Sequence, residues 1–178
     1  MNRVQQMYTI ARMAVYHFTL HAYRSWRADH PRGYTVFGEG YRPANEVAAR
    51  CNDERASQKP ATFSHDVQVV MLRLTHDICV VEHWRLEAVA FDPTHAHVLL
   101  SWKNFQSWEE VQRRLKNLLS LKLNQHFRST GRKWFSRRHG APRGVRDRTH
   151  YDQLVDRYFP SHRRGIGWRR GDVLPEVT

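Results

Sequence analysis

The chain has 178 residues, of which 29 are Lys or Arg and 17 are Asp or Glu, so its formal charge is +12. Its 40 % apolar and 12 % aromatic content excludes a wholly disordered chain, and its length favours one domain with appendages. The sequence has no apolar run long enough to span a membrane, and its two distant cysteines, Cys51 and Cys79, exclude a disulfide framework and a cysteine zinc finger.

The basic residues are concentrated in the second part of the chain. Residues 103–178 hold 18 of the 29 basic residues but only 7 of the 17 acidic ones. Most of these 18 are arginines, whose planar guanidinium fork matches phosphate. The asymmetry predicts binding to a polyanion, with a solvated basic surface that has no partner as the alternative. The first eight residues lack the apolar stretch of a secretory signal. The low cysteine content makes a reducing cytoplasm the expected compartment.

The first predicted element is a strand over residues 14–23, where apolar side chains alternate with His17, Thr19 and His21. Such alternation is typical of a half-buried strand with a polar second face. Residues 24–63 contain three prolines and three glycines without a sustained period. We expect an irregular insertion there, with a short helix near residues 44–49.

The next expected elements are a helix capped by Ser64 and a β-hairpin. The apolar residues that follow Ser64 at helical spacing are Val67, Val70, Met71, Leu74 and Ile78. Residues 84–91 and 95–102 read as two strands, joined by a turn at Asp92-Pro93.

Ser107 and Glu110 form a predicted capping box that opens a helix continuing to about His126. Its inward side chains are Val111, Leu115, Leu118, Leu119 and Leu123, and its other surfaces carry Arg113, Arg114, Lys116 and Lys122. Residues 129–148 are basic and punctuated by glycines, with room for a strand near residues 144–146.

A last helix is expected after Thr149, which is positioned to cap it. Its apolar stripe consists of Tyr151, Leu154, Val155 and Tyr158. From Gly165 onward the sequence predicts a loosely ordered tail.

This order of elements predicts an α+β fold. A βαββαβ string folds most simply into an antiparallel sheet with two helices on one face, the ferredoxin-like arrangement, here with an extra C-terminal helix that carries the tyrosine. In that topology the first and third strands are neighbours, so His17, Thr19 and His21 share a face with the histidines of the third strand. We expect one domain over residues 1–168, with residues 24–63 as the insertion, and a basic tail over residues 169–178.

His95 and His97 are two apart in a predicted strand, so both imidazoles project from the same face and can meet one metal ion. Two ligands are too few, and a third must come from another element. The alternative is a pair of histidines on a solvated face.

Tyr158 and His162 are the candidates that complete the site. On a helix their spacing of four places a hydroxyl and an imidazole on one face. A tyrosine becomes an effective nucleophile where a metal polarises the phosphate that it attacks. Two points stay open: Tyr158 also completes an apolar stripe typical of a core aromatic, and Pro160 can interrupt the helical turn.

These residues resemble a known family. Residues 93–100, Pro-Thr-His-Ala-His-Val-Leu-Leu, are similar to the His-hydrophobic-His strand of HUH-type single-tyrosine transposases. Residues 157–162, Arg-Tyr-Phe-Pro-Ser-His, followed by Gly165, resemble the tyrosine helix of the REP-associated tyrosine transposase branch, and residues 134–138 and 145–148 also fit it. The resemblance extends from the first strand to about Trp168.

The resemblance implies a transposase that binds single-stranded or hairpin DNA and a divalent ion, Mg²⁺ or Mn²⁺. It implies that His95 and His97 are metal ligands with His162 as the third, and that Tyr158 cuts the strand, leaving a 5′-phosphotyrosine and a free 3′-hydroxyl. By donor type alone, histidines favour zinc, so the residues leave the metal open. Relatives often carry Asn or Asp at the position of Thr94.

Eight basic residues are the expected phosphate contacts: Arg113, Arg114, Lys116, Arg143, Arg146, Arg148, Arg163 and Arg164. Trp134 and Trp168 are candidates for base stacking or for core packing. The alternative to an enzyme is a non-catalytic module of the same fold that binds single-stranded or hairpin nucleic acid. We expect action at the bacterial nucleoid as a monomer or homodimer, and Tyr151 is the alternative nucleophile.

Overall fold

A five-stranded antiparallel sheet forms the centre of the computed structural model, which describes residues 14–36, 39–137, 142–162 and 164–176. The strands follow the order β6-β1-β5-β4-β7 across the sheet, and each strand pairs antiparallel with its neighbours. Their bounds are β1 (Ala14–His21), β4 (Arg85–Asp92), β5 (His95–Trp102), β6 (Arg143–Gly144) and β7 (Gly167–Arg169). The expected pairing of the first and third predicted strands is confirmed, because β1 lies beside β5 along its whole length.

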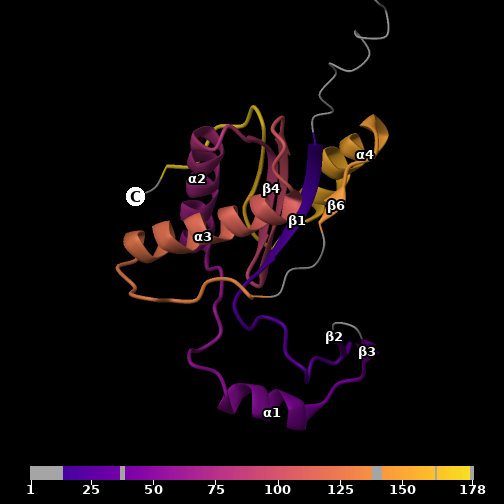
Figure 1. The fold of residues 1–178 in the computed structure, drawn as a ribbon, viewed down its shortest axis with the longest axis vertical. Helices are drawn as coiled ribbons and strands as arrows, with labels where there is room; N and C mark the ends of the chain where they lie inside the picture. The colour runs from indigo at the N-terminus through magenta and orange to yellow at the C-terminus, as the bar shows by residue number, and fades with distance from the viewer. Residues whose placement is uncertain (1–13, 37–38, 138–141, 163, 177–178) are drawn as a thin grey trace, which may run out of the picture.

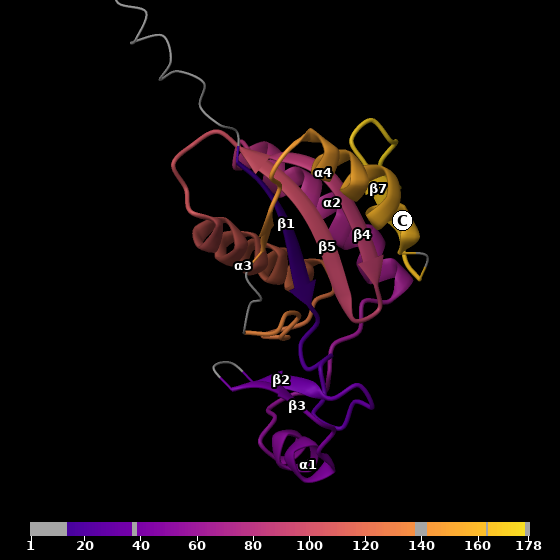
Figure 2. The same cartoon turned by 90° about the vertical axis from the view of Figure 1, so that its right-hand side faces the viewer.

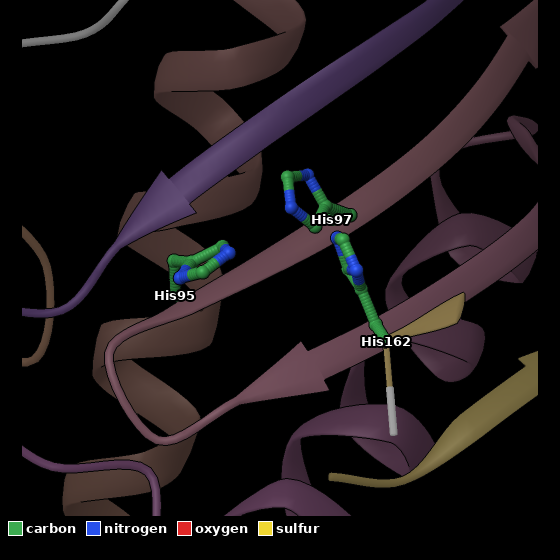
Figure 3. A group of neighbouring side chains, drawn as sticks. All are labelled: His95, His97 and His162. Carbon is green, nitrogen blue, oxygen red and sulfur yellow. The ribbon is translucent and has the colours of Figure 1, made fainter. Parts of the chain in front are cut away.

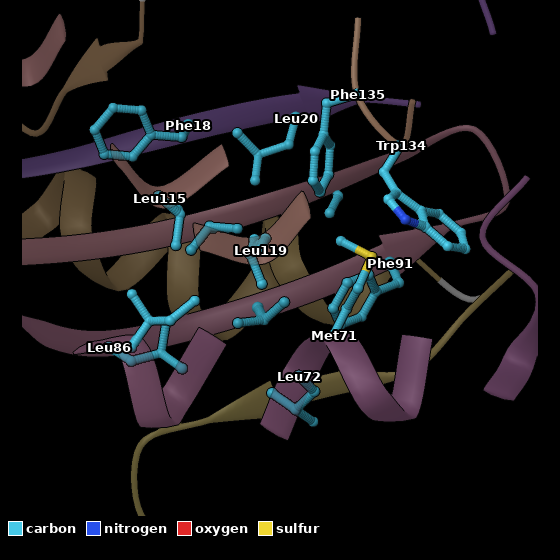
Figure 4. Close-up of a cluster of buried hydrophobic side chains, with 14 of the residues drawn as sticks. Phe18, Leu20, Met71, Leu72, Leu86, Phe91, Leu115, Leu119, Trp134 and Phe135 are labelled. Atoms are coloured by element: carbon cyan, nitrogen blue, oxygen red, sulfur yellow. The ribbon is translucent and has the colours of Figure 1, made fainter. Parts of the chain in front are cut away.

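Two long helices, α2 (His65–Val81) and α3 (Trp108–His126), cover one face of the sheet (Figure 1). The hydrophobic core lies between these helices and the sheet (Figure 4). Its members include Phe18, Leu20, Met71, Leu72, Leu86, Phe91, Leu115, Leu119, Trp134 and Phe135. The architecture is α+β, and the strand order is compatible with a ferredoxin-like fold.

The capping interactions expected at the starts of α3 and α2 are confirmed to different extents. The capping box of α3 is confirmed, since the Ser107 side chain accepts from the Glu110 amide and the Glu110 carboxylate accepts from the Ser107 amide. Ser64 is the N-cap residue of α2, as expected, but its side chain makes no capping hydrogen bond.

The opposite face of the sheet is covered by a short C-terminal helical segment (Figure 2). It consists of α4 (Arg148–Gln153), the π-helical turn η2 (Leu154–Tyr158) and α5 (Phe159–Ser161). The side chain of Asp147, rather than that of Thr149, caps α4 by accepting a hydrogen bond from the amide of His150 at 2.8 Å. Helices therefore lie on both faces of the sheet.

The insertion is more regular than its composition suggests. It contains a hairpin of β2 (Tyr34–Val36) and β3 (Gly40–Arg42), followed by α1 (Glu46–Glu54), which extends well beyond the expected short helix. Figure 2 shows this unit beyond the end of the sheet where β1 ends and β5 begins. Arg24 and Arg27 pair with Asp53, so α1 is tied to the chain that leaves β1.

The C-terminal segment also differs from expectation. The tail expected to be loosely ordered from Gly165 adds β7 to the sheet, because β7 pairs with β4. The final expected strand is β6, two residues long and beginning one residue earlier than expected. Trp134 and Trp168 are both buried in the core, which supports the packing interpretation for them. Among the described residues, no helix is long and apolar enough to cross a membrane.

The exposed and buried leucines of α3 provide a test of this core. We predict that Leu119→Ala lowers the free energy of unfolding by about 2–5 kcal/mol, because Leu119 is fully buried and the truncation leaves a cavity. Leu121→Ala, on the same helix but 56 % exposed, is the matched control and is expected to cost less than about 0.5 kcal/mol. Urea unfolding of both variants measures the difference, and equal losses would contradict the assigned inward face of α3.

Candidate metal and tyrosine site

The strict alternation of β5 divides its side chains between the two faces of the sheet. Ala96, Val98 and Leu100 belong to the hydrophobic core, whereas Leu99 packs under the C-terminal helical segment. Because successive side chains of a strand point to opposite faces, His95 and His97 lie on the same face as Leu99. Their ring centroids are 4.7 Å apart.

Strand β1 adds further imidazoles to this face. In the β1–β5 register, Thr19 lies opposite His97 and His21 lies opposite His95. His17 is two residues before Thr19, and its ring centroid is 4.9 Å from that of His97. The expected shared face of the two strands is thus confirmed.

His162 completes a group of three histidines able to hold a metal ion. It follows directly after α5, and its ring centroid is 4.3 Å from that of His97 and 6.0 Å from that of His95. One ligand nitrogen from each of the three residues lies within 4.8 Å of the others. Figure 3 shows the three rings gathered over β5.

The chemistry of the group fits a divalent cation. Nε2 of His162 is buried and has no hydrogen-bond partner among the described residues, which leaves its lone pair for a ligand that the protein itself does not supply. Three histidine nitrogens form a common ligand set of catalytic metal sites, in which a further position is left for water or substrate.

Burial keeps the imidazoles of His95 and His97 neutral. It lowers the pKa of His97 to about 2, with the neighbouring His95 acting in the same direction. Burial also lowers the pKa of His95, although Asp92 opposes this effect. Metal binding requires an unprotonated nitrogen, so both residues are in the ligand form at neutral pH.

His97 is oriented from behind by two residues of β1. Its Nδ1 lies 2.9 Å from Nε2 of His17 and 3.2 Å from Oγ1 of Thr19. Burial lowers the pKa of His17 to about 4, so His17 is neutral at pH 7. Its Nε2 can therefore accept a hydrogen bond from the Nδ1–H group of His97. If Nδ1 of His97 donates, its Nε2 is free of a proton and faces the site, which is the usual arrangement behind a metal-binding histidine.

His95 has similar support from the turn that precedes it. The hydroxyl of Thr94 donates to Asp92 at 2.8 Å and lies 3.0 Å from Nδ1 of His95. Since its proton is engaged by the carboxylate, the hydroxyl oxygen is an acceptor for Nδ1, and Nε2 of His95 remains for a ligand. Thr94 and Asp92 together therefore orient this histidine, a role that the sequence did not reveal.

Tyr158 lies at the edge of this group. Its hydroxyl is 3.4 Å from Nε2 of His97, and its ring is 4.8 Å from that of His162. The side chain is 36 % exposed, so the interpretation of Tyr158 as a plain core aromatic is wrong. Burial raises the pKa of its phenol, while Arg143 acts in the opposite direction.

The π-helical turn explains why Tyr158 leaves the core. In a regular helix Tyr158 would share the buried side of Leu154 four residues earlier. The wider turn of η2 instead brings Phe159, five residues after Leu154, into the buried position. Such turns recur at functional sites, because they turn one side chain out of the helical register. Pro160 is accommodated in the first turn of α5, so it does not separate Tyr158 from His162.

The expected phosphate contacts fall into several groups. Arg143 pairs with His17 across β6 and β1, next to the site, and Arg164 is close enough to Asp92 to lower its pKa. Arg146 and Arg148 lie together around a separate pocket. Arg113 is exposed on α3, while Arg163 lies outside the described residues.

Two of the expected contacts are engaged within the protein. Arg114 forms an ion pair with Glu82, which joins α3 to the end of α2. Lys116 is buried, and its ammonium donates to the carbonyl of Ser136. The prediction that Lys116 is a surface phosphate contact is therefore wrong, because the loop after α3 folds over it.

The structure thus brings together His95, His97, His162 and Tyr158, and it leaves Tyr151 apart, with its hydroxyl on Glu87 at 3.0 Å. Sequence reasoning did not assign His17, Thr19 or Asp92 a supporting role. Neither a protein-family model nor a curated protein matches the chain. The assignment of the site therefore depends on its geometry.

Removal of the support behind His97 should weaken metal binding. We predict that His17→Leu lowers the affinity for Co²⁺ by about 10–100-fold, the usual effect of losing the residue that orients a ligand histidine. His17→Gln, whose amide oxygen can accept the same hydrogen bond, should restore most of the affinity. Visible absorption during a Co²⁺ titration measures this.

His21→Gln is the matched control for that experiment. His21 lies on the same face of the same strand, and its ring is 5.9 Å from that of His95, but the structure of the described residues gives it no hydrogen bond to a candidate ligand. We expect it to change the affinity less than threefold. An unchanged affinity in His17→Leu would contradict the supporting role of His17.

The burial of Lys116 leads us to predict a specific dependence of the free energy of unfolding on pH. Burial lowers its pKa from 10.5 to about 8, so between these values the unfolded chain binds more protons than the folded one, and stability rises with pH. Over the whole window the gain is at most on the order of 3 kcal/mol, and screening of the ammonium by nearby solvent reduces it. Urea unfolding between pH 8 and 10 should show wild-type protein gaining stability relative to Lys116→Met, whereas parallel curves would contradict a buried ammonium.

Proposed function

We propose that the protein is a metal-dependent transposase that nicks and joins single-stranded DNA near hairpin ends, with Tyr158 as the nucleophile. The proposal extends to membership of the REP-associated tyrosine transposase branch, which the sequence resembles. The observation that carries it is the convergence of three histidine ligands, all within 4.8 Å, with a tyrosine hydroxyl 3.4 Å from one of them. His95 and His97 come from β5, Tyr158 from η2 and His162 from directly after α5, so the site joins parts of the chain that lie far apart in the sequence.

The reaction is an in-line transfer of a phosphoryl group to a tyrosine. The phenolate oxygen of Tyr158 attacks the phosphorus, the bond from phosphorus to the 3′-oxygen breaks, and the leaving oxygen takes up a proton to give a free 3′-hydroxyl. The phenol proton is lost to solvent or to a base. The 5′-phosphotyrosine retains the energy of the broken ester, so attack by a 3′-hydroxyl reverses the step and joins strands without a nucleotide cofactor.

His95, His97 and His162 would hold the divalent ion, with His17, Thr19 and Thr94 orienting the ligand rings. When bound, the ion offsets the negative charge that develops on the phosphate. The resemblance implies Mg²⁺ or Mn²⁺, while the three nitrogen donors favour zinc.

The surroundings of Tyr158 bear on how its phenol is activated. Burial raises the pKa of the phenol, and Arg143 on the neighbouring strand β6 opposes this effect only in part, so Tyr158 is protonated at neutral pH. The phenolate needs further positive charge, which the bound divalent ion would supply. Arg164, at the His95 end of the site, is a further cation that can contact the phosphate backbone of the DNA.

In this proposal the fold is ferredoxin-like, and the helical segment after β6 is the tyrosine helix. The partner is single-stranded or hairpin DNA at the bacterial nucleoid, and the enzyme acts as a monomer or homodimer. The exposed part of the Tyr158 side chain provides the route by which a scissile phosphate would reach the hydroxyl.

A covalent adduct tests the nucleophile directly. The substrate is a pool of single-stranded hairpins with randomised flanks, labelled at the 3′-end, because the 5′-phosphotyrosine keeps the 3′-side fragment on the protein. With Mg²⁺ or Mn²⁺, we predict labelled protein on a denaturing gel for the wild type, at least about 100-fold less for Tyr158→Phe, and none after chelation.

Tyr41→Phe, an exposed tyrosine of the insertion, is the control and should form the adduct at the wild-type level. An adduct that persists in Tyr158→Phe and disappears in Tyr151→Phe would assign the nucleophile to Tyr151 and contradict the proposal. Binding of the pool by the wild type without any adduct, with every cation tried, would identify a non-catalytic binding module instead.

A further inference from the structure

A second pocket lies on the same face of the sheet as the histidines. It has a volume of about 420 Å³, and four of its lining residues are arginines: Arg85, Arg146, Arg148 and Arg170. These come from β4, from the approach to α4, from α4 itself and from the chain after β7. The pocket therefore collects cations from distant parts of the sequence into one place.

A β-bulge places a carboxylate at the floor of this pocket. The β4–β5 register shifts between Leu86 and Ala88, so Glu87 is an extra residue in β4. Ala88 and Ala90 face the C-terminal helical segment, and regular alternation from them would turn Glu87 into the hydrophobic core. The bulge instead aims Glu87 at the same face as Ala88, a typical use of bulges beside functional sites.

Glu87 is 1 % exposed, and donors from four elements surround it. Ser101 donates to it at 2.8 Å and Tyr151 at 3.0 Å. Nε of Arg85 donates at 2.5 Å, and Nε of Arg170 lies 3.8 Å away. A buried carboxylate is costly unless it is paired and hydrogen-bonded, and these contacts satisfy it.

The arrangement leaves guanidinium groups for a ligand. Arg85 and Arg170 approach Glu87 through Nε, and their side chains remain 44 % and 56 % exposed, so the other donors of each fork are accessible. Arg148 pairs with Asp152 and lies over the ring of Tyr151. Glu87 thus fixes two arginine forks at the floor of a pocket whose lining arginines outnumber its two acidic residues, Glu87 and Asp147.

We propose that this pocket binds a backbone phosphate of the DNA strand, at a nucleotide other than the one that is cut. The inference rests on the proposed function, and it adds the path of the strand. Arginine forks match the geometry of phosphate oxygens better than that of any other common cellular anion except a carboxylate.

The strand register separates the two sites along the sheet. His97 pairs with Ala90, and Arg85 pairs with Ser101, four residues further along β5. At about 3.3 Å per residue, His97 and Ser101 are about 13 Å apart along the strand, which is why we assign the two sites to different phosphates. One phosphate cannot contact both, so a strand that reaches Tyr158 would continue over the C-terminal helical segment to Arg85 and Arg170.

The test is the double variant Arg85→Gln/Arg170→Gln in the full chain. Fluorescence anisotropy with a labelled single-stranded oligonucleotide pool should show an affinity about 10-fold lower than that of the wild type. The slope of log affinity against log salt should fall by about 0.7 for each phosphate that the variant no longer neutralises. The control is Arg73→Gln/Arg128→Gln, which removes the same charge from α2 and from the chain just after α3. It should change the affinity less than about twofold and leave the salt slope unchanged.

Two further measurements separate the possible failures. Co²⁺ binding to the double variant should equal that of the wild type, and if the wild type itself binds no metal, the proposed function fails rather than this inference. Wild-type affinity and salt slope in the double variant would overturn the inference. The last measurement is a titration with inorganic phosphate and with a mononucleotide. If the wild type binds these and the double variant does not, while both bind the oligonucleotide equally, the pocket is a site for free phosphate. That result would also overturn the inference.

Discussion

The antiparallel pairing of β1 with β5 sets the positions of the four strand imidazoles, which are those of His17, His21, His95 and His97. It places Thr19 opposite His97 and His21 opposite His95, so the polar sides of both strands face the same way. A shift of one residue in this register would turn the β1 histidines into the hydrophobic core, at a large cost in free energy. The C-terminal helical segment is then docked on that face by Leu154 and Phe159, which brings His162 and Tyr158 over β5.

The site combines burial with neutrality. Burial lowers the pKa values of His17 and His97 to about 4 and about 2, so the imidazoles are kept as uncharged donors and acceptors. Their hydrogen bonds to one another offset the cost of desolvation, and they also fix which nitrogen is presented to a ligand. Nε2 of His162, which has no hydrogen-bond partner in the part of the chain that the structure describes, is the exception that a cation would satisfy. Glu87 is a second buried polar group whose neighbours offset the cost of its desolvation. There the buried group is a carboxylate, and its neighbours include arginines.

Much of this arrangement follows from period-two alternation, which predicted the shared face of His17, Thr19, His95 and His97. The capping box at Ser107 could also be predicted from the sequence, because it depends only on neighbouring residues. What the sequence could not show depends on tertiary contacts or on one-residue irregularities. The π-helical turn that exposes Tyr158, the bulge that re-aims Glu87 and the loop that buries Lys116 each change a side chain's environment without a local sequence signal.

The most direct test of the account is the position of a metal ion in crystals grown with zinc or manganese, located from its anomalous scattering. The account predicts one ion bound by a nitrogen from each of His95, His97 and His162, at about 2.1 Å for zinc, with the Tyr158 hydroxyl beside it. An ion bound elsewhere while these three imidazoles remain without one, at saturating metal, would contradict it.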